Sequence, residues 1–305
     1  MHVSLIGTNG FLSESIALAC NDNCFELSVF GRREPRRHAY TSFHAIDLIE
    51  EHLDCKKLVR SDLIIYTAGA GIQSNLKEGL DLIYNLNVVV PVQICNRLKE
   101  LAYKGAFVSF GSYFEIGENA SDKAYTEIDV LNSQFKAPND YVISKRMLSR
   151  FFSSFSTEFT FLHFILPTIY GERESNHRLI PYTLNAIERN IDLSFTSGMQ
   201  IRQYIYISDL VNILFRAVSA NLTSGVYNVA GAEELSVKQL VSMLFELKGR
   251  SVTNNVFGKA ERLDVGMKIL KLDGKKLQRR IGHEPKTKIS QVYNKYNLSD
   301  NGSDN

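Results

Sequence analysis

The sequence predicts an α/β protein in which a doubly wound parallel sheet is followed by a smaller C-terminal lobe. Over the first two-thirds of the chain, short apolar runs alternate with amphipathic stretches of helical spacing. A turn containing glycine separates the first apolar run from the first amphipathic stretch. Because a helix between two strands of one sheet makes a right-handed crossover, this alternation predicts parallel strands with helices on both faces.

Six short apolar runs are expected to form the strands of this sheet: residues 3–6, 26–30, 41–46, 62–66, 106–110 and 159–166. Helices are expected between them at 10–19, 75–100 and 139–155. We assign residues 1–166 to this sheet domain.

After residue 166 the pattern loosens. Short apolar pieces at 204–207 and 226–229 are joined by loops, and helical stretches are expected at 210–220 and 236–247. We expect residues 167–296 to form mainly a smaller lobe that packs on the strand ends and supplies the wall of a ligand site. The last residues, 297–305, are polar and are expected to be disordered.

Composition argues against several classes of protein. The 305 residues are 44% hydrophobic and 22% charged, so the chain can bury a sizeable core. The net charge of +2 is too small to indicate a nucleic-acid or membrane partner. No apolar run approaches the roughly 20 residues that cross a bilayer, and the chain begins with a strand pattern rather than a signal peptide. We expect a cytoplasmic protein.

The four cysteines are expected to be reduced, buried thiols in that compartment. None of them forms a Cys-x-x-Cys pair, and no histidines are spaced to complete a metal site. The sequence therefore predicts no bound metal.

A glycine turn follows the first expected strand and opens the first expected helix, in the order that dinucleotide binding by a Rossmann-type fold requires. Gly7 permits a tight turn, and Gly10 lets a pyrophosphate approach the N–H groups of the helix N-terminus. Ser13 stands where a third glycine commonly packs the helix on the strand. The spacing alone would also suit an ordinary turn. The residues expected to contact the cofactor here are Gly7, Asn9, Gly10, Phe11 and Leu12.

The residues after the second expected strand bear on which dinucleotide is bound. An acidic residue at this point commonly bonds both ribose hydroxyls of NAD. Here the stretch is Val29-Phe30-Gly31-Arg32-Arg33, which has no carboxylate. Arg32 could instead bond a 2′-phosphate, so NADP(H) is favoured over NAD(H). A solvated basic loop is the alternative.

Two further segments follow expected strands and would border the cofactor. Asp47 and Leu48, after the third strand, are expected near the adenine. Ala68, Gly69 and Ala70 follow the fourth strand, and their small side chains would let the cofactor lie close to the backbone.

Tyr141 and Lys145 are one helical turn apart on an expected helix. The spacing i, i+4 puts both side chains on one face. The lysine charge would stabilise tyrosinate and lower the tyrosine pKa, which would make Tyr141 a usable acid or base near neutral pH. Lys145 could also bond the nicotinamide ribose. Taken alone, the pair is also compatible with an ordinary helix-surface contact.

Ser112 adds a third polar group at the same edge of the sheet. It follows the strand at 106–110, and ligands bind at the carboxyl ends of strands in such folds. A hydroxyl there could hold a substrate carbonyl beside Tyr141. Because the glycine turn, Ser112 and the Tyr141–Lys145 helix occur in this order, we interpret Ser112, Tyr141 and Lys145 as catalytic residues.

Together these motifs resemble the extended short-chain dehydrogenase/reductase family, in its sugar-nucleotide branch, over roughly residues 2–295. Two further segments carry the resemblance, Pro167-Thr168-Ile169-Tyr170-Gly171 and Arg202-Gln203-Tyr204-Ile205-Tyr206-Ile207-Ser208-Asp209. The resemblance implies a nucleoside-diphosphate sugar as substrate. It also implies a homodimer formed through a four-helix contact of the stretches 75–100 and 139–155.

The resemblance also implies roles for single residues. Arg202 would grip a substrate phosphate, since arginine offers a fork of donors to phosphate oxygens. Thr168 would face the sugar, and Leu179 would begin the wall around the base. Tyr113, next to Ser112, would contact the substrate, and Pro167 the cofactor.

Details within the family favour one reaction type. Members that remove water carry an Asp-Glu pair after the catalytic hydroxyl, whereas Ser112 is followed by Tyr113-Phe114. Members that invert the carbons beside a ketone often have a cysteine where Phe114 stands. Hydride transfer at one carbon remains, either as NADPH-dependent reduction of a 4-keto-6-deoxy sugar nucleotide or as 4-epimerisation with tightly held NAD.

The reductase is the favoured alternative. The stretches 112–114, 179–182 and 196–202 look closer to the 4-ketoreductases of bacterial surface polysaccharides, such as CDP-abequose synthase. A dinucleotide-binding regulator without catalysis is less expected, because such proteins usually lack the tyrosine or the lysine. The chain departs from the family pattern at Ser13, Gly111, Ile116 and Gln203.

Overall fold

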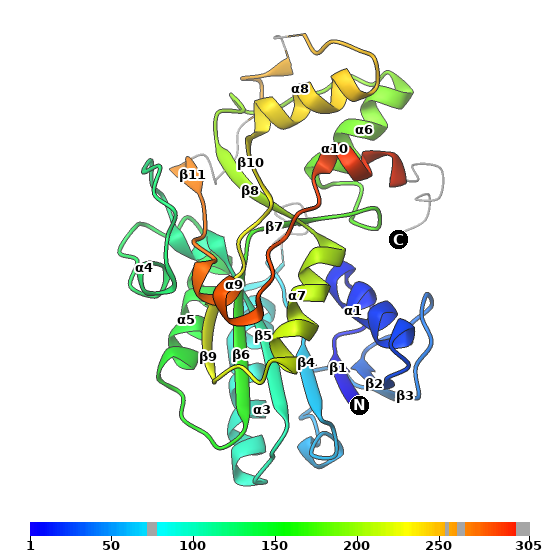
Figure 1. Ribbon diagram of the computed structural model, residues 1–305, viewed down its shortest axis with the longest axis vertical. Helices are drawn as coiled ribbons and strands as arrows, with labels where there is room; N and C mark the ends of the chain where they lie inside the picture. The colour runs from blue at the N-terminus through cyan, green and yellow to red at the C-terminus, as the bar shows by residue number, and fades with distance from the viewer. Residues whose placement is uncertain (72–77, 254–255, 261–265, 297–305) are drawn as a thin grey trace.

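The structure of the chain is a computed structural model that describes residues 1–71, 78–253, 256–260 and 266–296. The tail predicted at 297–305 lies outside these residues. A seven-stranded sheet has the order β3-β2-β1-β4-β5-β6-β9, and every neighbouring pair in it is parallel (Figure 1). The predicted α/β fold with a parallel sheet is therefore confirmed. The strands are β1 (His2–Ile6), β2 (Glu26–Gly31), β3 (Ser42–Ala45), β4 (Leu63–Tyr66), β5 (Ala106–Ser112), β6 (Thr160–Leu166) and β9 (Gly225–Asn228).

The strand order places a switch point at β1. From β1 the chain winds outward to β2 and β3, and it then returns to the other side of β1 through β4, β5 and β6. In open parallel sheets, ligands bind in the crevice beyond the carboxyl ends of the strands at such a point. The loops that follow β1 and β4 start side by side at this edge, because Ile6 pairs with Tyr66.

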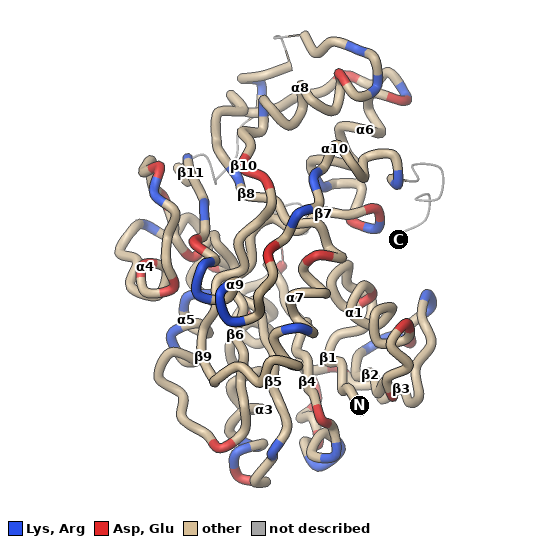
Figure 2. The backbone as a smooth tube through the Cα atoms, viewed as in Figure 1, with Lys and Arg blue, Asp and Glu red and all other residues tan. Residues whose placement is uncertain are grey.

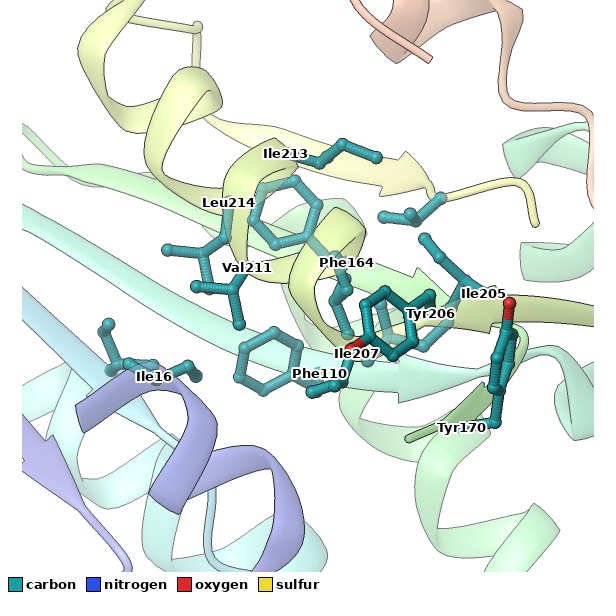
Figure 3. Close-up of a cluster of buried hydrophobic side chains, with 14 of the residues drawn as sticks. Ile16, Phe110, Phe164, Tyr170, Ile205, Tyr206, Ile207, Val211, Ile213 and Leu214 are labelled. Atoms are coloured by element: carbon teal, nitrogen blue, oxygen red, sulfur yellow. The ribbon is translucent and has the colours of Figure 1, made fainter. Parts of the chain in front are cut away.

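Helices cover both faces of this sheet (Figure 1). Because successive strand residues point to opposite faces, Val108 packs in one core cluster and its neighbour Phe107 in the other. The first cluster contains Ile16 of α1 (Phe11–Asp22) and Leu214 of α7 (Ile207–Ser219), packed with Phe164 of β6 (Figure 3). The second is covered by α3 (Val90–Glu100) and α5 (Asp140–Ser154).

The single helix expected at 75–100 is divided in the structure, and residues 75–77 lie outside the described part. It consists of α2 (Leu80–Tyr84), a π-helical segment η3 (Asn85–Val89) and α3. Pro91, at the start of α3, has no backbone N–H to donate to the carbonyl one α-helical turn earlier, at Asn87. We attribute the π segment to this missing hydrogen bond, because insertions of this kind re-route backbone bonds inside helices.

The smaller lobe is built by the later part of the chain, at the top of Figure 1. Its sheet contains β7 (Thr168–Tyr170), β8 (Ile201–Tyr206), β10 (Glu233–Ser236) and β11 (Ile269–Leu270). Its helices include α6 (Leu179–Arg189), α8 (Val237–Leu247) and α10 (Ile289–Val292). The two apolar pieces expected after residue 166 belong to different sheets, since β8 lies in the lobe while β9 pairs with β6. The segment 167–296 thus also returns α7 and β9 to the larger sheet.

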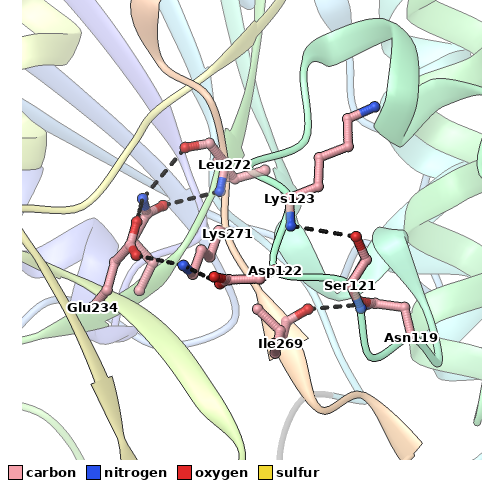
Figure 4. A network of polar contacts seen from close by, with 9 residues as sticks. Asn119, Ser121, Asp122, Lys123, Glu234, Ile269, Lys271 and Leu272 are labelled. Atoms are coloured by element: carbon pink, nitrogen blue, oxygen red, sulfur yellow. Dashed lines mark hydrogen bonds and ion pairs between the residues drawn. The ribbon is translucent and has the colours of Figure 1, made fainter.

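The C-terminal segment joins the lobe to the loop that follows β5 (Figure 4). Asn119 donates a hydrogen bond of 3.0 Å to the carbonyl oxygen of Ile269. Lys271 forms ion pairs with Asp122 and with Glu234, the latter at 2.9 Å. α4 (Glu127–Leu131) follows this loop, and α9 (Lys275–Ile281) follows the C-terminal contacts.

Charges of both signs are spread over the chain, without a single-sign face in this view (Figure 2). Within the described residues, no helix is both long and apolar enough to span a membrane. The same part of the chain contains no cluster of three or more His, Cys, Asp or Glu side chains that could hold a metal ion.

Candidate functional site

The glycine turn lies at the carboxyl end of β1, against the loop after β4. Gly7 has φ of +103°, a conformation that favours glycine, and a Cβ there would lie 2.9 Å from the backbone nitrogen of Ala68. Gly10 caps α1 in an extended conformation. The first turn of α1 leaves the N–H groups of Phe11 and Leu12 without an acceptor inside the helix. These donors and the helix dipole fit the pyrophosphate of a dinucleotide.

Ser13 accounts for the missing third glycine. Its side chain is buried, and Gly10 N–H donates to its hydroxyl at 2.9 Å while the hydroxyl lies 2.8 Å from the Gly10 carbonyl oxygen. The serine therefore holds the turn closed from within.

The end of β2 lies beside this turn. A Cβ on Gly31 would lie 2.7 Å from the side chain of Thr8, so β2 and the turn are in direct contact. The hydroxyl of Thr8 and the amide of Asn9 both donate to the carbonyl oxygen of Arg33, at 2.9 and 3.2 Å. Arg32 is exposed on this loop. Its guanidinium is thus available to a ligand that reaches past the glycine turn.

The two segments that were expected to border the cofactor, after β3 and after β4, differ in their surroundings. Asp47 and Leu48 follow β3, but one carboxylate oxygen of Asp47 already accepts a hydrogen bond of 3.0 Å from Ile49 N–H. Ala68, Gly69 and Ala70 follow β4, and a Cβ on Gly69 would lie 4.0 Å from Lys145 Nζ. The small-residue loop and the predicted catalytic lysine are therefore neighbours.

Asn87 is a site residue that the sequence reasoning missed. It is buried in the π segment, where its side chain accepts from Ala70 N–H at 3.1 Å and donates to the Ala70 carbonyl at 2.9 Å. It also donates to the hydroxyl of Ser144 at 3.0 Å, and that hydroxyl donates to the carbonyl oxygen of Tyr141. Asn87 thus ties the loop after β4 to α5. The sequence signal for this residue is a polar amide four residues before Pro91, in a stretch that is otherwise largely apolar.

The structure brings Ser112, Tyr141 and Lys145 together. Ser112 ends β5, and its hydroxyl lies close enough to Tyr141 of α5 to act against the rise of the tyrosine pKa. Lys145 Nζ lies 5.9 Å from the centre of the Tyr141 ring and donates to the carbonyl oxygen of Phe110 at 2.9 Å. Asn139 caps this helix by accepting from Val142 N–H at 3.0 Å, which fixes the start of α5 and hence the direction of Tyr141.

The electrostatics of the pair differ from the sequence prediction. Burial raises the pKa of Tyr141 to about 12, and the nearby Ser112 hydroxyl and the charge of Arg178 only partly oppose this rise. Burial lowers the pKa of Lys145 to about 8, while the carboxylate of Glu115 acts to raise it. The predicted lowering of the Tyr141 pKa by Lys145 is therefore wrong for the free protein. The reason is burial, because removing the phenol from water disfavours the tyrosinate more than the neighbouring groups favour it.

The predicted substrate contacts lie on the lobe side of this pair. Tyr113 is buried, and its hydroxyl lies 2.6 Å from that of Thr168 on β7. The ring of Phe114 stacks edge-on against Tyr141, with the centroids 6.4 Å apart. Tyr113 therefore hydrogen-bonds Thr168, and the neighbouring ring of Phe114 contacts Tyr141.

Three more predicted residues lie in or next to the smaller lobe. Pro167 is buried between β6 and β7, and Leu179 begins α6. Arg202 is buried on β8, where it donates to the carbonyl oxygen of Met267 at 2.7 Å. Beside it, Gln203 holds the backbone of Leu272, by accepting from its N–H at 3.2 Å and donating to its carbonyl at 3.3 Å. The departure at Gln203 thus anchors the C-terminal segment.

Solved structures share this fold. A UDP-glucose 4-epimerase from Thermotoga maritima, crystallised with UDP-glucose, superposes with a TM-score of 0.82 over 97% of both chains at 16% identity. The enzyme WbmG of Bordetella bronchiseptica, in complex with NAD, gives a TM-score of 0.79 at 16% identity, over 99% of this chain and 96% of that one.

Curated relatives and a family model match the sequence itself. The CDP-abequose synthase of Yersinia pseudotuberculosis is 23% identical over 273 residues, which is 83% of this chain and 87% of the relative. That of Salmonella muenchen is 27% identical over 149 residues, 48% of this chain and only 46% of the relative. The model described as "NAD dependent epimerase/dehydratase family" matches residues 3–230. Since this match spans most of the chain and includes the glycine turn, Ser112, Tyr141 and Lys145, the protein belongs to the NAD dependent epimerase/dehydratase family.

Proposed function

We propose that the protein is a cytoplasmic NADP(H)-dependent reductase that converts a nucleoside-diphosphate 4-keto-6-deoxy sugar into the 4-hydroxy sugar during bacterial surface polysaccharide synthesis. The observation that carries this proposal is the grouping of Ser112, Tyr141 and Lys145 beside the loop after β4. Lys145 Nζ lies 5.9 Å from the centre of the Tyr141 ring, and it donates at 2.9 Å to the carbonyl oxygen of Phe110, two residues before Ser112 on β5. The similarity to two CDP-abequose synthases supports the substrate class. The residues after Ser112 are Tyr113 and Phe114, which offer no acid–base pair for removal of water.

The residues at the strand ends fit a bound dinucleotide. Gly7, Gly10 and the N–H groups at the start of α1 would hold its pyrophosphate, and Gly69 and Lys145 would border its nicotinamide ribose. When bound, the reduced cofactor supplies the hydride. We assign the preference for NADP(H) to Arg32, because it is exposed beside the turn and the stretch 29–33 has no carboxylate.

The chain's own residues handle the proton and the developing charge. Ser112 and Tyr141 would both donate hydrogen bonds to the ketone oxygen as negative charge develops on it. Tyr141 would then transfer its phenolic proton to that oxygen. The ammonium of Lys145 would stabilise the tyrosinate that remains. In the free protein Tyr141 is protonated at neutral pH, which is the state a proton donor requires.

A 4-epimerase is the second candidate, and the fold shared with a UDP-glucose 4-epimerase supports it. The two activities differ in their use of the cofactor. A reductase consumes one NADPH per sugar, whereas an epimerase returns the hydride to the other face of the same carbon and retains its NAD.

The test is NADPH oxidation by the purified protein with a panel of CDP-, dTDP-, GDP- and UDP-linked 4-keto-6-deoxy sugars. The reductase is expected to consume NADPH with at least one of them, and Tyr141→Phe should lower the turnover by about 10²–10⁴-fold with little change in NADPH affinity. NAD that survives dialysis, together with interconversion of 4-epimers without net NADPH loss, would establish the epimerase instead. A Tyr141→Phe variant of normal rate would refute both.

We also infer a homodimer through α5 and the segment before α3. Ile143 and Met147 of α5, Val89 of η3 and Leu80 of α2 are large apolar side chains that are exposed in the single chain. α2 and η3 pack beside α5, so these side chains belong to neighbouring helices. Met147→Glu should convert a dimer into a monomer in light scattering, whereas Met199→Glu, at an exposed residue of the smaller lobe, should not.

A further inference from the structure

A fully buried carboxylate stands directly behind the catalytic serine. Glu115 lies in the short 3-10 turn η4 (Tyr113–Ile116) that follows Ser112, and its exposed fraction is 0%. Glutamate is almost never fully buried unless it is paired or hydrogen-bonded, because burial removes the hydration of its charge. Glu115 therefore does not serve solubility, and we expect it to have a role inside the protein.

The space that Glu115 occupies is opened by Gly111. A Cβ on Gly111 would lie 2.5 Å from Glu115 Oε1, 2.8 Å from His163 Nε2 and 3.1 Å from Ser149 Oγ. No side chain larger than hydrogen fits at 111 unless Glu115 moves. Glycine at position 111, where the family pattern has another residue, therefore leaves the room that the Glu115 carboxylate fills.

The contacts of Glu115 connect three elements of the site. Its Oε1 accepts a hydrogen bond of 2.7 Å from the backbone N–H of Ser112, and the nearby Ser149 hydroxyl acts to lower the pKa of the carboxyl group. Ser149 lies two turns beyond Tyr141 on α5, so it continues the helix face of Tyr141 and Lys145. Its hydroxyl also lies 2.9 Å from His163 Nε2 on β6. Within the described residues, Glu115 Oε2 has no hydrogen-bond partner.

The titratable groups around this carboxylate come from α5 and β6. Lys145 and Arg146 of α5 both act on it, and Arg146 also donates to its backbone carbonyl at 2.7 Å. Tyr141 faces it from the same helix. Burial lowers the pKa of His163 to about 3, so this imidazole is neutral and supplies no positive charge. Burial raises the pKa of Glu115 to about 6, so it is ionised above that pH.

We propose that Glu115 is a positioning residue of the hydride-transfer site, which fixes the backbone that presents the Ser112 hydroxyl and provides the negative charge that balances Lys145. The chemical step rests on the proposed function, but the arrangement of Glu115, Ser112 and Lys145 does not. Because its charge favours the protonated form of both Lys145 and Tyr141, loss of the carboxylate should move the titration of both groups to lower pH.

The experiment measures the reactivity of Lys145 without any substrate. Acetic anhydride labels only neutral amines, so the extent of Lys145 acetylation against pH, read by mass spectrometry, gives its titration midpoint. In Glu115→Gln, whose amide oxygen can still accept from Ser112 N–H, the midpoint should fall by roughly 0.5–1 unit. The matched control is Glu127→Gln, which removes another buried carboxylate, one that accepts from Asn228 N–H at 2.9 Å. It should leave the midpoint unchanged.

Turnover provides the second measurement. With an active wild-type protein, Glu115→Gln should lower kcat about tenfold and leave KM for the sugar nearly unchanged, because Ser112 and Lys145 act in the transition state. Glu115→Asp keeps the charge but shortens the reach to Ser112. The midpoint of Lys145 acetylation should therefore stay close to that of the wild type, whereas kcat should fall by less than in Glu115→Gln. Glu115→Asp also serves if the glutamine variant does not fold. A Lys145 midpoint that is the same in all variants, or an unaltered kcat in both Glu115 variants, would overturn the proposal.

Failure of the proposed function gives a different result. In that case the wild-type protein oxidises no NADPH with any sugar nucleotide, yet the acetylation midpoints of wild type and Glu115→Gln still differ.

Discussion

The ammonium of Lys145 donates a hydrogen bond of 2.9 Å to the carbonyl oxygen of Phe110, two residues before Ser112 on the same strand. This bond joins α5 to β5 at the point where both present the side chains that we propose to be catalytic. It also holds the lysine in a partly buried place, where its pKa is lowered to about 8. The charge of Lys145 is therefore sensitive to pH in a range that is easily measured.

The pH dependence of the reaction follows from this value. The ammonium is present below about pH 8 and is lost as the pH rises through it, whereas Tyr141 keeps its proton to about pH 12. Since kcat/KM reports the free enzyme, it should fall on the alkaline side with a midpoint near 8. Initial rates over a pH series test this. A flat profile up to about pH 10 would contradict the role of the ammonium.

Replacing the lysine tests the same group directly. Lys145→Met keeps the aliphatic length but removes the charge, so kcat should fall by about 10²–10⁴-fold and the alkaline midpoint should disappear. Lys104→Met is the control, because Lys104 is an exposed residue that pairs with Glu158 on the surface. Its kinetics should match those of the wild type.

Cofactor choice is predicted to depend on Arg32. Arg32→Ala should weaken NADP⁺ binding by about 10- to 100-fold, which corresponds to one charge-assisted hydrogen bond, and leave NAD⁺ binding nearly unchanged. Arg36→Ala removes an exposed arginine from the same loop and is the matched control. Titration calorimetry with both dinucleotides gives the two affinities. Equal losses for NADP⁺ and NAD⁺ would show that Arg32 does not read the 2′-phosphate.

The buried amide of Asn87 is predicted to stabilise the loop that borders the cofactor. Asn87→Leu leaves the N–H and carbonyl of Ala70 without their partner, and one such unsatisfied buried group costs about 1–3 kcal/mol. Urea unfolding should show this loss, and dinucleotide affinity should fall with it. Asn85→Leu, at a half-buried position of the same π segment, should have a smaller effect on both.

Several parts of this site could be predicted from the sequence, for a physical reason. The carboxyl ends of parallel strands meet at one edge, so the glycine turn, Ala68–Ala70 and Ser112 had to be neighbours once the strands were identified. The i, i+4 spacing then directed Tyr141 and Lys145 to one side. These relationships depend only on strand order and helical period.

Other parts of the site depend on how side chains pack, which sequence spacing does not reveal. The direction of Tyr113 depends on a 3-10 turn, which buries the ring and places its hydroxyl 2.6 Å from that of Thr168. The titration of Tyr141 depends on burial, which spacing does not report. The match between Gly111 and Glu115 appears only when β5 and η4 are packed together. All three features depend on how side chains that are distant in the sequence pack against one another.

Gly111 provides a direct test of that packing. A methyl group there would lie 2.5 Å from Glu115 Oε1, so Gly111→Ala should destabilise the protein by about 1–3 kcal/mol through overpacking. Gly79→Ala is the control, because no atom lies within 4 Å of the Cβ that it adds. Equal stabilities of the two variants in urea would mean that the carboxylate does not fill the space beside residue 111.

The stability of the protein should also record the cost of burying Glu115. Its pKa rises from 4.5 in the unfolded chain to about 6 in the folded one, so the protonated side chain favours folding below pH 4.5 and this contribution is lost as the pH rises through 6. The loss amounts to about 2 kcal/mol, from 1.36 kcal/mol per pKa unit. Glu115→Gln cannot titrate, so its free energy of unfolding relative to wild type should increase by that amount between a pH well below 4.5 and a pH well above 6. Measuring the difference at two pH values cancels any constant effect of the amide.

Parallel pH dependences of the two proteins would mean that this carboxylate does not titrate abnormally. A rise that follows the prediction, together with a lower kcat, would show that the site keeps a destabilising charge because the reaction uses it.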